Sequence, residues 1–198
     1  MLAYRLASLI HWPPRERAIA DLLTRIPPGG RWRIVDVGCG PGRLVSTASR
    51  LGFTYLGLET DPAFVEHCRR CFAGLSHVSF TSTRFEDYSL APTDIVVMNG
   101  VVHHLPDVLF RCFLRHASAA AFLIICDHWR VPGRLTWWSA ELQRRDRGKH
   151  VRDIAVFERL DGWERLGYRE IRIGAAGITL WPYFAGLYRP KRDSEGAS

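Results

Sequence analysis

The sequence predicts an α/β fold: a doubly wound, Rossmann-like sheet of seven strands that ends in a C-terminal antiparallel hairpin. Over residues 31–127, strand-like apolar runs alternate with amphipathic helical runs at intervals of roughly 20 to 25 residues, and turn residues join them. This alternation is typical of a parallel sheet with helices on both faces. After residue 127 the alternation stops, and the strand-like runs 169–177 and 178–190 are close enough in sequence to form a hairpin.

Periodicity and terminating residues define the individual elements. Residues 14–26 are expected to form one amphipathic helix, because two prolines precede its apolar spacing and PPGG ends it. Thr60 and Asp61 suit the start of a second helix, which Gly74 ends. Between 31 and 167 the pattern predicts strand 31–37, helix 43–52, strand 54–59, helix 60–74, strand 77–83, strand 93–100, helix 101–117, strand 121–127, helix 128–146 and helix 157–167.

Composition excludes several classes of protein. With 198 residues, 47% hydrophobic and 24% charged, the chain is typical of a single globular domain. No apolar run approaches the roughly 18 uncharged residues of a membrane span, and the first residues lack the pattern of a signal peptide. The five cysteines lie mostly in apolar or helical runs, as in a reduced cytoplasmic protein. Cys68 and Cys71 have no second pair, so no metal is expected.

The net charge of +7 comes almost entirely from arginine. Scattered arginines on helix faces are usually solvated, and we favour that interpretation over a nucleic-acid surface. The densest basic cluster, residues 144–152, fits an anionic substrate or a helix end that meets its own dipole.

A glycine-rich turn follows the first predicted strand. Its glycines, Gly38, Gly40 and Gly42, let the backbone turn sharply and approach a ligand closely, and Asp36 stands two residues before the first of them. The spacing G-x-G-x-G differs from the dinucleotide fingerprint G-x-G-x-x-G. A carboxylate at this turn repels phosphates and suits a cationic amino group, so the turn favours a sulfonium amino-acid nucleoside over NAD.

A second acidic residue strengthens this interpretation. Glu59 closes the second strand of the alternating region, where a carboxylate can accept hydrogen bonds from both ribose hydroxyls of a nucleoside. The alternative is a glycine turn beside a solvated glutamate. The ordered succession of strand, acid, glycines, helix, strand and acid argues against that alternative.

At this point the chain resembles the class I S-adenosylmethionine-dependent methyltransferases, over about residues 30–127. The resemblance rests on VDVGCGPG (35–42), LGLETDP (56–62), FEDYSL (85–90) and DIVVMNGVVHHLPD (94–107). It implies S-adenosylmethionine as cofactor, S-adenosylhomocysteine as product, and no metal. It also implies a cofactor site whose loop surrounds the methionyl end and whose acid binds the ribose, made of Asp36, Gly38, Cys39, Gly40, Gly42, Glu59 and Thr60.

The chain departs from the family pattern at the adenine end of the site. Many relatives carry glycine and aspartate where this chain has Thr83 and Arg84, so the adenine amino group loses its usual acceptor. Phe85 is then expected to pack on the ring, and Glu86 is an alternative acceptor. Beyond the fourth strand, Asn99 and Val101 match family positions that line the methionine side.

The pair His103 and His104 is the candidate for catalysis. Histidine titrates near neutral pH and can accept a proton from an acceptor hydroxyl. The alternative is a structural pair that satisfies backbone groups at a helix start. Methyl transfer from a sulfonium is an in-line displacement, so the protein mainly has to align the reactants and exclude water.

The acceptor is expected over the carboxyl ends of the fourth and fifth strands. As a hypothesis, His128, His150 or Arg152 faces it; the alternative is that these arginines cap helix ends and the tryptophans pack a lid. The segments that point to this place also contain Tyr4, His11, Trp12, Asp127, Trp129, Arg130, the run 146–152, Trp181, Tyr183 and Phe184.

The chain is therefore interpreted as one cytoplasmic domain, 1–198, that methylates a small metabolite on oxygen, nitrogen or carbon as a monomer or homodimer. We expect a lid helix in 1–30, a cofactor-binding core in 31–127, acceptor-side helices and the hairpin in 128–190, and a tail in 191–198. The alternatives are an RNA methyltransferase, which the charge favours although MNGV replaces an N-P-P-Y motif, and a non-catalytic cofactor-binding partner subunit.

Overall fold

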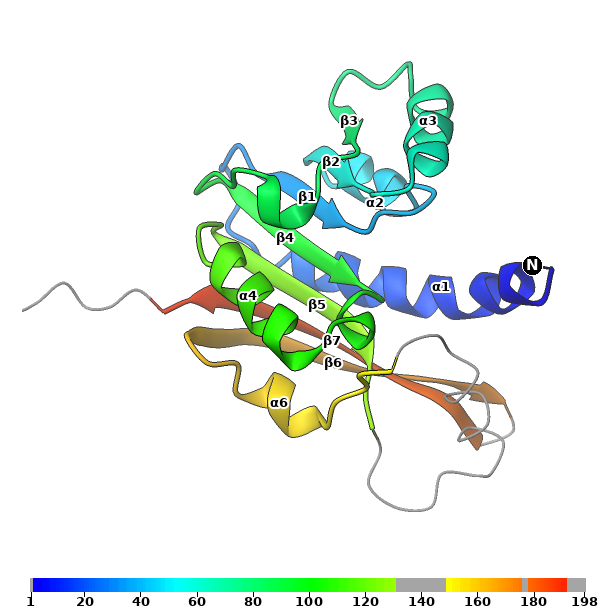
Figure 1. Cartoon of the computed structure of the whole chain (residues 1–198), viewed down its shortest axis with the longest axis vertical. Helices are drawn as coiled ribbons and strands as arrows, with labels where there is room; N and C mark the ends of the chain where they lie inside the picture. Colours follow the sequence, from blue (N-terminus) through cyan, green and yellow to red (C-terminus); the bar gives the residue numbers. More distant parts are fainter. Residues whose placement is uncertain (1, 131–148, 176–177, 192–198) are drawn as a thin grey trace, which may run out of the picture.

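A single seven-stranded sheet organises the chain, as the sequence predicts (Figure 1). The computed structural model describes residues 2–130, 149–175 and 178–191. The strand order is β3-β2-β1-β4-β5-β7-β6, with β1 to β5 parallel and β7 antiparallel to both β5 and β6. The strands are β1 (Arg33–Val37), β2 (Thr54–Leu58), β3 (Val78–Thr81), β4 (Asp94–Asn99), β5 (Phe122–His128), β6 (Trp163–Ala175) and β7 (Ile178–Pro190).

Helices cover both faces of the sheet (Figure 1). On one face lie α1 (Leu2–Leu23), α2 (Val45–Arg50) and α3 (Pro62–Cys71), and on the other lie η1 (Phe85–Asp87), η2 (Val102–His104), α4 (Asp107–Ala117) and α6 (Ile154–Glu158). None of the described helices is long and apolar enough to cross a membrane.

The central strands are apolar along their length because both of their faces are buried. In β1, Ile34 packs with the helices of the first face and Val35 with those of the second. The register continues this division across the sheet, since Ile34 pairs with Ile95 and Val35 with Val96 of β4. The two apolar layers fix the sheet and hold its carboxyl edge in place.

Three predicted elements were wrong in their extent. The first helix begins at Leu2 and contains Pro13 and Pro14. Proline's fixed φ is helical, although each proline removes a main-chain N–H and crowds the carbonyl four residues earlier. The predicted helix 101–117 breaks into η2 and α4, since Pro106 pushes the preceding residue into an extended conformation (ψ 123°).

The third error concerns the predicted helix 157–167. The helix α6 ends at Glu158, and β6 begins at Trp163. A register shift between Arg165 and Gly167 interrupts the alternation of β6, so its apolar residues imitate helical spacing. The predicted helix 128–146 lies almost entirely outside the described residues; its first residue, His128, ends β5.

Candidate functional site

The candidate residues gather at one edge of the sheet. The glycine loop follows β1, Glu59 follows β2, Asn99 ends β4, and Asp127 and His128 end β5. Because parallel strands place their carboxyl ends at the same edge, these residues lie at the edge where ligands bind in open α/β sheets.

The glycine loop turns as predicted, with positive φ at Gly38 (66°), Gly40 (52°) and Gly42 (72°). A Cβ at Gly38 would lie 3.0 Å from Val101 Cγ2, so the loop after β4 packs onto this glycine. A Cβ at Gly40 would meet no atom within 4 Å, which leaves room for a ligand beside the loop. Gly42 instead faces Phe72, which would lie 2.8 Å from its Cβ.

The Glu59 carboxylate is held by two main-chain donors. Gly40 N–H donates to its Oε2 over 2.9 Å, and Asp61 N–H donates to its Oε1 over 3.0 Å. Each carboxylate oxygen can accept a further hydrogen bond, so the oriented group still suits a pair of vicinal hydroxyls. Thr60, beside it, is exposed.

Asp36 is buried beneath the glycine loop. Its Oδ2 accepts a 2.7 Å hydrogen bond from the Tyr55 hydroxyl. The pKa of Asp36 is raised to about 7, mainly by burial; the hydrogen bond from Tyr55 lowers it, the charge of Glu59 raises it, and the charge of Arg15 lowers it. Burial also raises the pKa of the neighbouring Cys39 thiol, so that side chain is uncharged and serves as packing.

The two adenine-side candidates, Phe85 and Glu86, follow β3 and differ in burial. The Phe85 ring is buried against Phe113 and His116, with centroid distances of 5.1 and 4.9 Å. The exposed Glu86 accepts a 3.0 Å hydrogen bond from Arg84. Burial would raise the pKa of Glu86, but its hydrogen bonds and the charge of Arg84 lower it overall.

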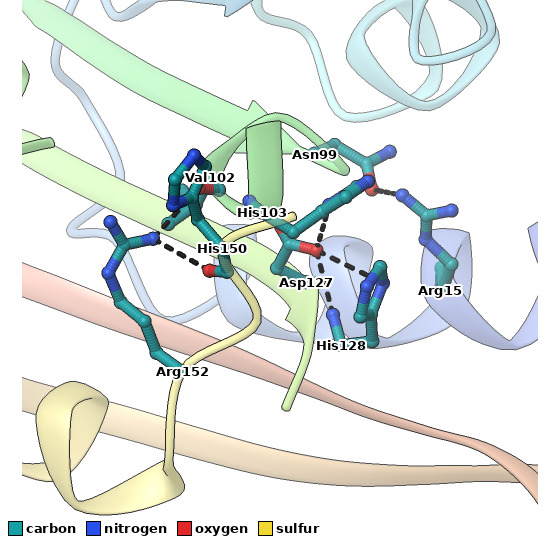
Figure 2. A network of polar contacts seen from close by, with 8 residues as sticks. All are labelled: Arg15, Asn99, Val102, His103, Asp127, His128, His150 and Arg152. Carbon is teal, nitrogen blue, oxygen red and sulfur yellow. Dashed lines mark hydrogen bonds and ion pairs between the residues drawn. The ribbon is translucent and has the colours of Figure 1, made fainter. Parts of the chain in front are cut away.

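His103 and Asp127 form a buried pair (Figure 2). His103 Nδ1 lies 2.7 Å from Asp127 Oδ1, and the main-chain N–H of His103 donates to Asp127 Oδ2 over 3.1 Å. Burial alone would raise the pKa of Asp127, but the hydrogen bond from His103 and the nearby positive charges lower it. The carboxyl is therefore ionised, so Nδ1 of His103 is the donor.

The His103 ring also lies between two other imidazoles. Its centroid is 3.9 Å from that of the exposed His104 and 4.1 Å from that of the buried His128. One ligand atom each from His103, Asp127 and His128 lies within 4.8 Å of the others, so these residues could hold a metal ion. Three N–H groups already donate to Asp127, which favours a hydrogen-bonded network over cation binding.

His150 and Arg152 secure the turn that carries the histidine pair (Figure 2). The main-chain N–H of His150 donates to the carbonyl of His103 over 3.0 Å. The buried Arg152 guanidinium donates to the carbonyls of Val102 and Leu105. It also donates to the His150 carbonyl and to Asp107. In this structure its donors are therefore occupied within the chain.

Comparison with known proteins shows which family the chain belongs to. A family model described as "Methyltransferase domain" matches residues 35–121. A trans-aconitate 2-methyltransferase of Methylobacterium nodulans is 34% identical, over 90% of this chain and 77% of the relative. This chain is a class I S-adenosylmethionine-dependent methyltransferase. A second protein of the same name, from Rhizobium etli, is 26% identical over 87% of this methyltransferase and 75% of its own length.

Solved structures support the fold of the methyltransferase. A geranyl diphosphate methyltransferase has a TM-score of 0.67 at 15% identity, covering 87% of this chain and 78% of its own. A mitomycin 7-O-methyltransferase has a TM-score of 0.65 at 20% identity, covering 93% and 60%. Binding of S-adenosylmethionine or S-adenosylhomocysteine is typical of the family. The room above Gly40 and the oriented carboxylate of Glu59 fit such a nucleoside.

The other segments predicted near the acceptor are only partly described in the methyltransferase. Tyr183 is buried edge-on to His128, with ring centroids 5.6 Å apart, and Phe184 is buried in the core. Trp12 is partly buried beneath Arg43, and Arg130 donates to the Val151 carbonyl. The side chains of Tyr4, His11 and Trp181, and all of residues 146–148, lie outside the described part.

Sequence reasoning missed one residue of this methyltransferase site. Arg15 of α1 extends to the sheet edge and donates to the side-chain oxygen of Asn99 (Figure 2). A signal was present, because Arg15 shares a helix face with Ile19 and Leu22, four and seven residues later, and both are fully buried. A charged residue on an apolar helix face indicates a specific partner.

Proposed function

We propose that this methyltransferase binds S-adenosylmethionine across the ends of β1 and β2 and methylates a small organic acceptor over the ends of β4 and β5. The observation that carries the proposal is the hydrogen bond from Gly40 N–H to Glu59, 2.9 Å long, beside the open side of Gly40. It presents a carboxylate at the place where the ribose hydroxyls would lie.

Each residue of the loop then has a distinct role. Glu59 accepts the ribose hydroxyls, with Thr60 at the solvent side, and Gly38 and Gly40 let the methionyl end approach the backbone. Asp36, in its ionised form, supplies negative charge near the amino group. Cys39 and Gly42 support the loop by packing, since Gly42 faces Phe72 and Phe80.

The opposite wall of the cofactor site comes from the segments after β3 and β4. Asn99 and Val101 line the methionine side, and Val101 is held against Gly38. Phe85 and Glu86 border the adenine, where the main chain of Phe85 contributes rather than its buried ring.

The cofactor supplies an activated methyl group, and the histidine pair acts on the acceptor. An acceptor hydroxyl or amine must lose a proton, and His103, whose Nδ1 donates to Asp127, accepts that proton at Nε2. Asp127 keeps the ring in the required tautomer. The exposed His104, whose ring is tilted by 43° against that of His103, borders the acceptor together with His128. His150 and Arg152 hold the turn that carries the pair.

Small carboxylic acids are the first acceptor class to test. The named relatives methylate trans-aconitate according to their names. A carboxylate acceptor needs no general base, and the histidine pair would then border it without taking a proton.

Calorimetric titration with S-adenosylhomocysteine tests the cofactor site. The wild type should bind, and Glu59→Gln should lose at least about tenfold in affinity, because an amide replaces a charged acceptor of two hydroxyls. Glu66→Gln, an exposed change on α3, is the control and should bind like the wild type. Equal binding by both variants would contradict the assignment of Glu59 as the acceptor of the ribose hydroxyls.

A further inference from the structure

Arg15 lies on α1, far in sequence from the two strands that it contacts at the sheet edge. Its guanidinium donates to Asn99 at the end of β4. Its Cζ atom also lies 4.7 Å from the centroid of the Tyr183 ring on β7, within the range of a cation–π interaction. The residue therefore contacts both β4 and β7 at this edge of the sheet. Figure 2 shows its contact with Asn99.

The chain leaves a specific space for this guanidinium. Gly100 has a φ of 72°, and a Cβ there would lie 2.8 Å from Arg15 Nη2. A side chain at position 100 would therefore displace the guanidinium. Glycine, the asparagine oxygen and the tyrosine ring together fix its position.

Among the described residues, no carboxylate lies within ion-pair distance of Arg15. The buried carboxyls of Asp36 and Asp127 are close enough for their charges to act on it. The nearby Asp127 accepts from His103 and His128, and Asp36 accepts from Tyr55. The Nε atom of Arg15 is buried and has no hydrogen-bond partner. A buried donor on a charged group is unfavourable unless an acceptor reaches it, so the site is suited to an anion.

We propose that Arg15 binds a carboxylate of the acceptor, an inference that rests on the proposed function. The acceptor side is favoured because the guanidinium lies over Tyr183 of β7 and α1 packs on β5, β6 and β7. Guanidinium matches carboxylate geometry with two parallel hydrogen bonds. The carboxylate of the cofactor's own amino-acid end is the other source of the same chemistry.

Calorimetry with two sets of probes separates these sources. The first set is S-adenosylhomocysteine and its decarboxylated analogue. The second is trans-aconitate, succinate and benzoate, each with its methyl ester, added to protein saturated with S-adenosylhomocysteine. The proteins are the wild type, Arg15→Gln, Arg15→Lys and Arg17→Gln, an exposed arginine of the same helix that serves as control. Thermal melts verify that each variant is folded.

The expected result is that Arg15→Gln weakens binding of at least one free acid by about tenfold or more, with S-adenosylhomocysteine affinity within about twofold of the wild type. The ester should be insensitive to the change, Arg15→Lys should recover part of the affinity, and Arg17→Gln should match the wild type. If Arg15→Gln weakens S-adenosylhomocysteine but not its decarboxylated analogue, Arg15 binds a carboxylate that belongs to the cofactor, and the acceptor assignment is overturned.

Other results overturn the role of Arg15 altogether. These are unchanged binding of every probe in Arg15→Gln, or no acid bound by the wild type while S-adenosylhomocysteine affinity is unaffected by the variant. If the wild type fails to bind S-adenosylhomocysteine, the proposed function falls instead, and the acids titrated into the unliganded protein decide the role of Arg15.

Discussion

The Tyr55 hydroxyl donates a 2.7 Å hydrogen bond to the Asp36 carboxyl, joining neighbouring strands directly beneath the glycine loop. The pair is buried, and burial raises the pKa of Asp36 from 3.8 to about 7. A carboxyl that is half protonated near neutral pH makes folding and ligand binding depend on pH.

The first prediction concerns stability against pH. Between pH 3.8 and about 7 the native Asp36 keeps a proton that the unfolded chain has released, so this group lowers the free energy of unfolding as pH rises through that window. Above about pH 7 its unfavourable contribution is constant, on the order of a few kcal/mol. Asp36→Asn should therefore gain stability relative to the wild type as pH rises from 4.5 to 8, measured by urea denaturation.

The exposed Asp161→Asn change is the matched control, and its difference from the wild type should not vary with pH in this way. Parallel pH curves for Asp36→Asn and the wild type would show that Asp36 is not the titrating group.

A second prediction concerns the tautomer of His103. Asp127→Asn removes the ionised acceptor of its Nδ1–H, so the preference for that tautomer should fall. Nitrogen-15 NMR of the imidazoles should detect an Nδ1–H tautomer in the wild type and a mixed or Nε2–H form in the variant. S-adenosylhomocysteine affinity should stay within about twofold, since Asp127 is placed on the acceptor side. An unchanged His103 spectrum would contradict the proposed role of Asp127.

Arg152 provides a third prediction. Arg152→Met leaves the carbonyls of Val102 and Leu105 without these donors, and it should lower the free energy of unfolding by about 2 kcal/mol or more. The ion pair with Asp107 adds little, because that carboxylate is 72% exposed. Hydrogen exchange should increase at residues 102–105. The exposed Arg159→Met change should affect neither measurement. Equal stabilities of the two variants would show that the hydrogen bonds from Arg152 do not stabilise the fold.

The fourth prediction compares two glycines that both have a left-handed backbone conformation. Gly40 and Gly52 both have positive φ, and a Cβ at either would meet no atom within 4 Å. Alanine at each should cost about 1 to 2 kcal/mol of stability through the left-handed conformation. Only Gly40→Ala places a methyl group in the open space of the proposed ligand site, so only this variant should bind S-adenosylhomocysteine more weakly in calorimetry. Equal affinities would place the ligand elsewhere.

The sequence was sufficient for the sheet and for the cofactor loop, because both depend on local patterns. Buried strands such as β4 are apolar along their whole length, and the glycines of the loop stand directly after β1. The start of α1 and the extent of β6 were not predictable in this way. Two prolines, which usually mark a helix end, stand inside α1, and a bulge disguises the strand periodicity of β6.

The polar side of the site depended on contacts between distant segments. The position of His103 in a helix-start motif gives no indication that Asp127 orients it, and the basic run gives none that Arg152 donates to main-chain carbonyls. Arg15 could have been found as a charge on an apolar helix face, but its partner on β4 depends on the folded topology.

The contact between α1 and the hairpin also has a consequence for biosynthesis. Ile19 and Leu22 of α1 are buried in one cluster with Tyr183 and Leu187 of β7. A ribosome releases α1 well before β7 has been made. The apolar face of α1 therefore stays uncovered by β7 while the parallel strands can already pair. We therefore expect the nucleoside half of the site to form first on the nascent chain. The guanidinium of Arg15 takes its final position against Tyr183 only when β7 pairs with β5.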